Sequence, residues 1–192
     1  MTDLGVDLAG MPLANPLMTA SGCAANGREL HRFFDIATLG AFVTKSVKAA
    51  PMSGRGTPRM AETAGGMLNS IGLQGPGIDA FVATDLPWLA TVGARVLVSI
   101  AGGDSAEFAR VARTLAAAPD WGCVAGIEVN ISCPNVANRG LVFACDPGSS
   151  AEVLSAVRAV VPCGTKLFAK LSPDVTDLVP IAAAALAAGA DG

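Results

Sequence analysis

Cys133 is the leading candidate for a reactive residue in this sequence, because it directly follows a segment that is predicted to form a strand. In residues 125–132 every second side chain is apolar, and the residues between them are Gly126, Glu128, Asn130 and Ser132. This period of two predicts a strand with one face packed against helices and one polar face. Pro134 has no N–H for a ladder and ends the strand. A thiol is therefore predicted at the carboxyl end of a strand, where parallel α/β folds bind ligands. The unperturbed pKa of a thiol is ~8.5, so a fraction of it is thiolate near neutral pH.

Two lysines are further candidates for a site at the same ends of strands. Residues 166–173 read as a strand that places Lys170 on a polar face, where an ammonium group is costly unless it meets an anion or an electron-rich group. Lys45 and Ser46 end a predicted strand at 39–47. From periodicity alone, Lys45 could equally be an exposed lysine at a strand terminus. Glu128 reads as a satisfied structural group at the other end of its strand.

Two glycine-containing segments are predicted to approach a ligand closely. The predicted first strand at 13–22 ends in Ala20, Ser21 and Gly22, which are small enough to let a flat ligand reach the backbone. Residues 48–78 hold too many glycines and prolines for regular elements, while the apolar and amide side chains of 66–74 argue against disorder. We therefore expect a long binding loop.

Composition limits the remaining possibilities. The chain has 192 residues, of which 52% are hydrophobic and 15% charged, with a net charge of -3. This length fits one domain, 1–192, and the charge gives no footprint for nucleic acid or anionic lipid. There is no apolar run of ~18 residues and no signal-peptide pattern, so we expect no membrane span and a cytoplasmic protein. Five cysteines without a CxxC pair predict reduced thiols and no metal site.

Strand-like and helix-like segments alternate along the chain. Helices are predicted at 26–40, 78–92 with a break at Pro87, 106–118, 150–161 and 176–189, between strands that include 94–102. Such alternation predicts a parallel sheet covered by helices. A (β/α)8 barrel has eight such units, and about five are present here. We expect either an open sheet or the N-terminal part of something longer.

Several short motifs, taken together, resemble dihydroorotate dehydrogenase of class 1, and specifically its 1B branch. The matching segments are 15–22 (NPLMTASG), 43–47 (VTKSV), 58–59 (PR), 62–63 (ET), 66–73 (GMLNSIGL), 130–136 (NISCPNV) and 146–147 (DP). The resemblance implies a flavin-bearing (β/α)8 TIM barrel that oxidises dihydroorotate to orotate with FMN.

The resemblance also implies roles for single residues. Cys133 matches the catalytic base, which takes a proton from the substrate ring carbon while hydride passes to the flavin. Substrate contacts are implied for Lys45, Asn69, Ile71, Gly72, Leu73, Asn130 and Asn135. Cofactor contacts are implied for Ala20, Ser21, Lys45, Ser46, Ser99, Asn130 and Lys170. Ser99 stands where the family commonly has an asparagine.

The same resemblance implies protein partners, and two alternative functions remain open. The 1B branch implies a partner subunit with FAD and an iron–sulfur cluster that passes electrons to NAD, whereas a relative acting alone could use fumarate. Family members form homodimers. The alternatives are a dihydropyrimidine dehydrogenase activity on the same scaffold and a non-catalytic fragment that does not bind FMN.

Overall fold

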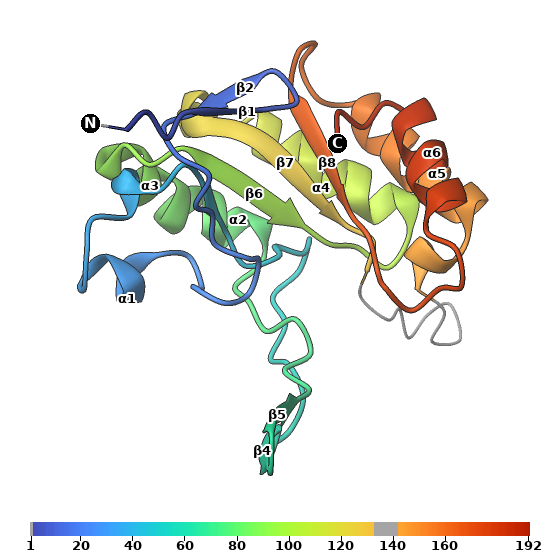
Figure 1. Cartoon of the computed structure of the whole chain (residues 1–192), viewed down its shortest axis with the longest axis horizontal. Coiled ribbons are helices and arrows are strands. Elements are labelled where there is room, and N and C mark those ends of the chain that lie inside the picture. The colour runs from blue at the N-terminus through green and yellow to red at the C-terminus, as the bar shows by residue number, and fades with distance from the viewer. Residues whose placement is uncertain (1, 133–141) are drawn as a thin grey trace.

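A four-stranded parallel sheet is the centre of the molecule (Figure 1). The computed structural model describes residues 2–132 and 142–192. The strand order is β3 (Phe42–Val43), β6 (Val96–Ile100), β7 (Val124–Asn130) and β8 (Lys166–Lys170), and every neighbouring pair is parallel. The predicted parallel α/β architecture is therefore confirmed.

Helices cover one face of this sheet. They are α3 (Leu86–Val92), α4 (Ser105–Ala116), α5 (Pro147–Arg158) and α6 (Val179–Ala187). Ile127, Val129 and Ile131 point to this side and are fully buried in the main core cluster. Burial of each such side chain stabilises the fold by about 1.5–3 kcal/mol. The alternation in the sequence thus predicted correctly which face of β7 is covered.

The opposite face of the sheet is apolar at the amino ends of the strands and polar at their carboxyl ends. At the amino ends, Val43 and Leu97 pack with Met11 and Leu13 in a second apolar cluster. Met11 and Leu13 both belong to β2 (Met11–Leu13), which forms an N-terminal hairpin with β1 (Val6–Leu8) that the sequence did not predict. At the carboxyl ends, the same face is polar. The hairpin therefore closes one end of this face and leaves the other for a site.

Short stretches extend the sheet at both edges. Met18 forms a single parallel bridge with Ala41, next to β3. Beside β8, the Asp191 N–H donates to the Leu167 carbonyl at 2.7 Å and the Ala169 N–H to the Gly192 carbonyl at 2.9 Å. A strand spanning 13–22 was thus a wrong prediction, because β2 ends at Leu13 and only the bridge at Met18 forms beyond it.

The predicted helix at 26–40 is also wrong. The structure has α1 (Arg28–His31) and a 3-10 turn (Ile36–Thr38) in its place. Gly27 precedes α1 at φ 96°, and the Asp35 side chain accepts from the Ala37 N–H and begins a separate turn. Phe33, between these two short elements, is 85% exposed and does not pack in the core.

Other helix boundaries differ for identifiable reasons. The segment 78–92 runs through α2 (Ile78–Ala80), a π-helical stretch (Phe81–Asp85) and α3, with Pro87 in the first turn of α3, where a proline is tolerated. α5 begins three residues earlier than predicted, because the Asp146 side chain caps it. The Ser149 N–H donates to this carboxylate and lowers the pKa of Asp146.

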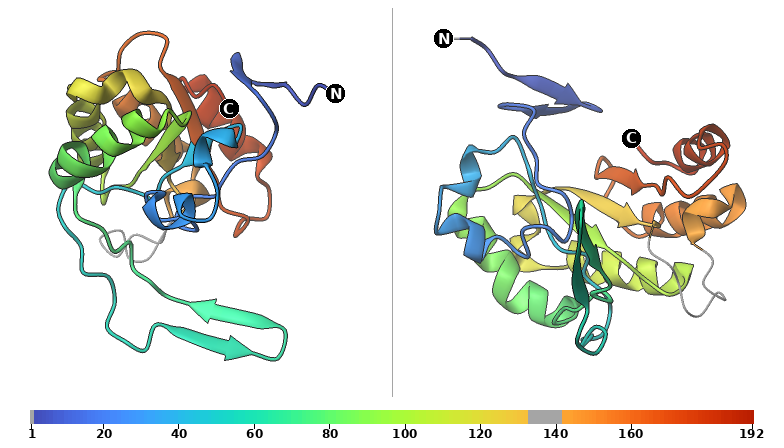
Figure 2. Two further views of the ribbon diagram at one scale, coloured as in Figure 1. Left: turned by 90° about the vertical axis from the view of Figure 1, so that its left-hand side faces the viewer. Right: turned by 60° about the horizontal axis from the view of Figure 1, so that its bottom comes forward.

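A two-stranded arm projects from the body (Figures 1 and 2). It consists of β4 (Met60–Thr63) and β5 (Gly66–Asn69), and all of their residues are exposed. Met52 and Gly75 close its base with two main-chain hydrogen bonds of 2.9 and 3.0 Å. The segment 48–78 was expected to be mostly loop, so this hairpin is a correction.

Candidate functional site

Polar side chains from three neighbouring strands form one hydrogen-bonded chain at the carboxyl end of the sheet. The Ser46 and Ser99 hydroxyl oxygens are 2.8 Å apart, and Asn130 Nδ2 donates to Ser46 Oγ at 2.8 Å. The Asn130 Oδ1 accepts from the Ser132 hydroxyl at 2.8 Å and from the Ser132 N–H at 3.3 Å. Ser46, Ser99 and Asn130 are all buried. The sheet therefore brings together three of the residues that the sequence singled out.

A bulge after β3 explains why Ser46 takes part. Val43 pairs with Leu97, but Val47 pairs with Ile100, so four positions on one strand match three on the next. One extra residue reverses the alternation of side chains beyond it. Val43 lies on the inner face, and without the bulge Ser46 would point toward the helices. The bulge turns Ser46 toward Ser99 and Asn130 instead.

Thr44 satisfies the backbone at this bulge. Its hydroxyl accepts the Ser99 N–H at 3.1 Å and donates to the Lys45 carbonyl at 3.1 Å. Thr44 has 0% exposure, so an unpaired N–H at Ser99 would be costly there. The sequence analysis missed Thr44. A threonine one residue before the predicted site was the available signal, but its role depends on the bulge.

Lys170 joins the site from the neighbouring strand. It is the register partner of Asn130, and its Nζ donates to the Ser21 hydroxyl at 2.9 Å. This hydrogen bond links β8 to the loop that the sequence predicted to lie close to a flat ligand. Ala20, in the same loop, is exposed. Lys170 and Ser21 are thus brought together across the polar end of the sheet.

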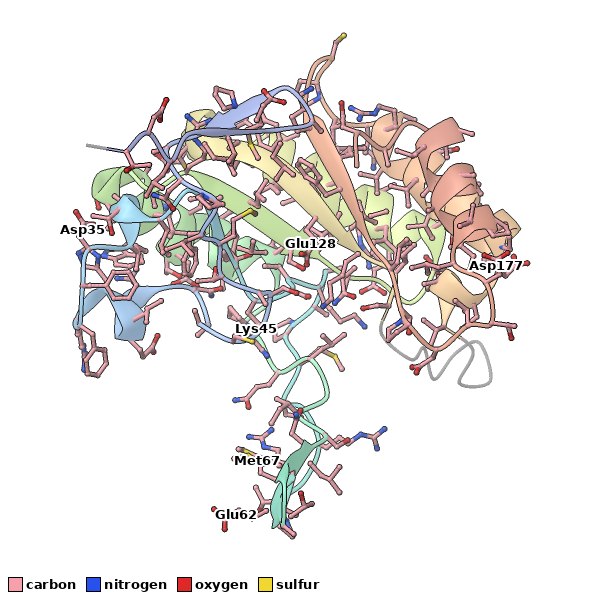
Figure 3. All side chains as sticks on the ribbon, viewed as in Figure 1. Asp35, Lys45, Glu62, Met67, Glu128 and Asp177 are labelled. Atoms are coloured by element: carbon pink, nitrogen blue, oxygen red, sulfur yellow. The ribbon has the colours of Figure 1, made fainter. Side chains whose placement is uncertain are left out.

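Glu128 and Lys45 lie on the body near the base of the arm (Figure 3). Glu128 pairs in register with Ser99 on one side and Phe168 on the other, which puts it on the inner face below the hydroxyl chain. Within the described residues its Oε1 is buried and has no hydrogen-bond partner. The expectation that Glu128 is fully satisfied is therefore wrong. Lys45 is half-buried, and its main-chain N–H donates to the Ala25 carbonyl at 2.9 Å.

The remaining predicted residues lie elsewhere. Asn69 is exposed on β5 and pairs in register with Met60 on β4. Figure 3 shows Glu62 and Met67, two other residues of these strands, on the arm that projects from the body. Ile71, Gly72 and Leu73 follow at the base of the arm, where Gly72 and Leu73 have φ of 79° and 52°. Their contact with a substrate stays a prediction. Cys133 and Asn135 lie outside the described residues.

The residues present fit the ring end of a flavin. A buried amide, two hydroxyls and an ammonium group can serve the carbonyl and nitrogen atoms of a planar heterocycle, and the small residues at 20–22, of which Ala20 and Gly22 are exposed, leave room for a flat ring. Within residues 2–132 and 142–192, no three His, Cys, Asp or Glu side chains are grouped so that they could hold a metal ion.

A cavity of about 540 Å³ lies at the opposite, amino end of the sheet. Its lining is mainly alanine and glycine, with Arg95 and Cys123 as the chemically distinctive members. Burial, and then the nearby Asp120 carboxylate, raise the pKa of the Cys123 thiol, so this cysteine is less reactive than an ordinary one. The cavity is remote from the hydroxyl chain, because β6 and β7 enter it only at their amino ends.

Fold and site together define an α/β protein with a cluster of buried polar side chains at the carboxyl ends of a parallel sheet. The family profile described as "Dihydroorotate dehydrogenase" matches residues 3–192, and the chain belongs to this family. In the described part of the chain, no helix is both long and apolar enough to cross a membrane.

Curated relatives are named "Dihydroorotate dehydrogenase B (NAD(+)), catalytic subunit". Those of Geotalea daltonii and Pelobacter propionicus are 47% and 48% identical over 98% of this chain, and that of Geobacillus kaustophilus is 45% identical over 100%. The chain spans 60% of the length of each of them. A crystal structure of the Eimeria tenella enzyme with ferulenol aligns with a TM-score of 0.74 at 19% identity, over 99% of this chain and 58% of that one. This likeness supports a partial (β/α)8 barrel.

Proposed function

We propose that this chain provides the flavin-binding face and the proton-transferring thiol of an FMN-dependent dihydroorotate dehydrogenase in pyrimidine biosynthesis. The observation that supports it best is the hydroxyl–amide chain of Ser46, Ser99 and Asn130, with Lys170 as the next register partner, in a member of this family. Oxidation of (S)-dihydroorotate to orotate requires removal of one proton and one hydride.

The residues of this chain divide that work. Cys133 Sγ takes the proton from the substrate ring carbon, a role that the family resemblance implies and that thiolate chemistry allows, since Cys133 follows the last residue of β7 by three positions in the sequence. Asn130 and Asn135 offer amides to the imide-like groups of the substrate, and Lys45 offers a positive charge to its carboxylate. Lys170, Ser46 and Ala20–Ser21 hold the ring of the flavin. FMN, when bound, supplies the acceptor for the hydride.

The partners are proposed on the same basis. The relatives are called catalytic subunits with NAD(+) in their name, which supports a partner subunit that passes electrons to NAD. From the family resemblance we further propose that this partner carries FAD and an iron–sulfur cluster. We also propose a homodimer and a cytoplasmic location. The location is supported by the four described cysteines, Cys23, Cys123, Cys145 and Cys163, all of which have free thiols.

The decisive experiment is anaerobic reduction of bound FMN by dihydroorotate. We expect the flavin absorption to bleach with dihydroorotate and not with dihydrouracil, which would be the reductant of a dihydropyrimidine dehydrogenase. Cys133→Ala should slow bleaching by about 10²–10⁴-fold, the usual contribution of a general base. Cys163→Ala, at an exposed cysteine, is the matched control and should leave the rate unchanged.

Two outcomes would contradict the proposal. Faster bleaching by dihydrouracil would reassign the substrate. Failure of the chain to take up FMN at all would favour a fragment without catalytic function, since flavin absorption is the signature of a loaded site.

A further inference from the structure

The Ser46 and Ser99 hydroxyl groups carry two protons, but the described residues provide a hydrogen-bond acceptor for only one of them. Ser46 Oγ accepts from Asn130 Nδ2 at 2.8 Å, and the two serine oxygens are 2.8 Å apart. Within residues 2–132 and 142–192, neither hydroxyl group has a further partner. Each serine carries one proton, but only one O–H···O bond joins them.

The orientation of the Asn130 side-chain amide fixes the direction of its hydrogen bond with Ser46. The Ser132 N–H is a donor only, so the Asn130 atom that it meets at 3.3 Å has to be the oxygen. The Ser132 hydroxyl meets the same oxygen at 2.8 Å. The amide nitrogen therefore faces Ser46, and Ser46 receives a hydrogen bond from it.

Burial decides which serine donates to the other. If Ser46 donated to Ser99, the Ser99 proton would lack an acceptor at a position with 0% exposure. If Ser99 donates to Ser46, the remaining proton belongs to Ser46, which is 6% exposed. An unsatisfied donor is more costly the more completely it is buried, so the second arrangement is favoured.

The proposed function already assigns Ser46 to the flavin ring. We propose that Ser99 is the positioning residue for this contact: its hydroxyl donates to Ser46 Oγ, and the Ser46 proton is thereby directed to an acceptor atom of the flavin ring, a carbonyl oxygen or a ring nitrogen. The inference rests on the proposed function, because the flavin is the ligand. Ser99 itself has no exposed surface, so it acts on a ligand only through Ser46. The bulge and Thr44 hold the pair in place, since the Thr44 hydroxyl binds the Ser99 N–H.

A double-mutant cycle on FMN affinity tests this relay. FMN fluorescence is titrated with the wild type, Ser46→Ala, Ser99→Ala and the double variant. We expect Ser46→Ala to raise the Kd about tenfold and Ser99→Ala about fivefold, in keeping with one hydrogen bond each. The double variant should be no weaker than Ser46→Ala alone, because Ser99 acts through Ser46. Both Ser46→Ala and Ser99→Ala should shift the visible flavin absorption in the same direction.

The matched control is Ser150→Ala. Ser150 is also 0% exposed, but it lies on α5 and its hydroxyl donates to the Phe143 carbonyl. This variant should keep the wild-type Kd and flavin spectrum. An unchanged Kd in Ser99→Ala, or losses in the double variant that simply multiply, would overturn the relay.

A measurement without ligand separates this inference from the proposed function. In the free protein, the Ser99 hydroxyl proton should exchange slowly enough to appear in NMR spectra of specifically labelled serine, and the Ser46 proton should not. The reverse pattern would overturn the relay whatever the FMN result. If the expected pattern is found in a chain that fails to bind FMN, the hydroxyl orientation stands, while the flavin as its ligand and the proposed function are both rejected.

Discussion

Replacing Thr44 with valine should test how the bulge that builds the site is held. Valine has nearly the shape of threonine, so the change removes the hydroxyl and little else. The structure then loses the two 3.1 Å hydrogen bonds to the Ser99 N–H and the Lys45 carbonyl. At 0% exposure no water replaces them. An unpaired buried donor costs about 1–3 kcal/mol, so we expect the free energy of unfolding to fall by about 2–3 kcal/mol.

Urea unfolding followed by circular dichroism measures this change. With a slope of about 2–3 kcal/mol per molar urea for a chain of this size, the midpoint should fall by about 1 M at an unchanged slope. Thr91→Val is the control, because the Thr91 hydroxyl donates to the Trp88 carbonyl at an exposed helix end. It should change the free energy of unfolding by less than about 0.5 kcal/mol. Equal midpoints for the two variants would refute the account of the bulge.

Two further predictions follow from the pKa shifts. For Asp191, burial acts to raise the pKa, but hydrogen bonds from the Leu167 N–H, Lys166 and Arg158 outweigh it, so the pKa is lowered overall. A lowered pKa stabilises the fold above the unfolded value of ~3.9, and this contribution is lost as the pH falls through the folded pKa. Asp191→Asn should therefore lower the free energy of unfolding by about 1–2 kcal/mol at pH 7 and leave it unchanged in acid below the folded pKa. Urea titrations at a series of pH values measure this, and a loss that is independent of pH would contradict it. Cys123, whose pKa is raised by burial, should react with iodoacetamide at pH 8 more slowly than the exposed Cys163, as peptide mapping would show, and equal rates would be inconsistent with that burial.

The strands of the central sheet could be predicted because their pattern is local. Alternating apolar residues in 125–132 and dense apolar residues in 94–102 place β7 and β6 within a few residues of their observed ends. Local pattern failed at 26–40, where Gly27 with φ 96° and the Asp35 cap divide the expected helix. These features depend on how the chain folds back, with Asn26 and Arg28 bound to Asp85 some 57 to 59 residues away.

The residues of the candidate site could be predicted from the sequence, but the hydrogen bonds between their side chains could not. The resemblance implied roles for Ser46, Ser99, Asn130 and Lys170, and the structure places all four at one end of the sheet. The hydroxyl pairing depends on the extra residue between Val43 and Val47, which a sequence read at a period of two does not reveal. For the same reason Thr44 was overlooked, although its hydroxyl holds the bulge.

Hydrogen exchange with and without FMN tests most directly whether the flavin lies at the polar end of the sheet. We expect FMN to slow amide exchange in peptides that cover Ala20–Gly22, Lys45–Val47 and Leu171–Ser172. Peptides that line the cavity at the amino end, Ala94–Arg95 and Gly122–Cys123, should exchange at the same rate in both samples. Protection of the amino-end cavity without protection of the first set would contradict the assignment of the site.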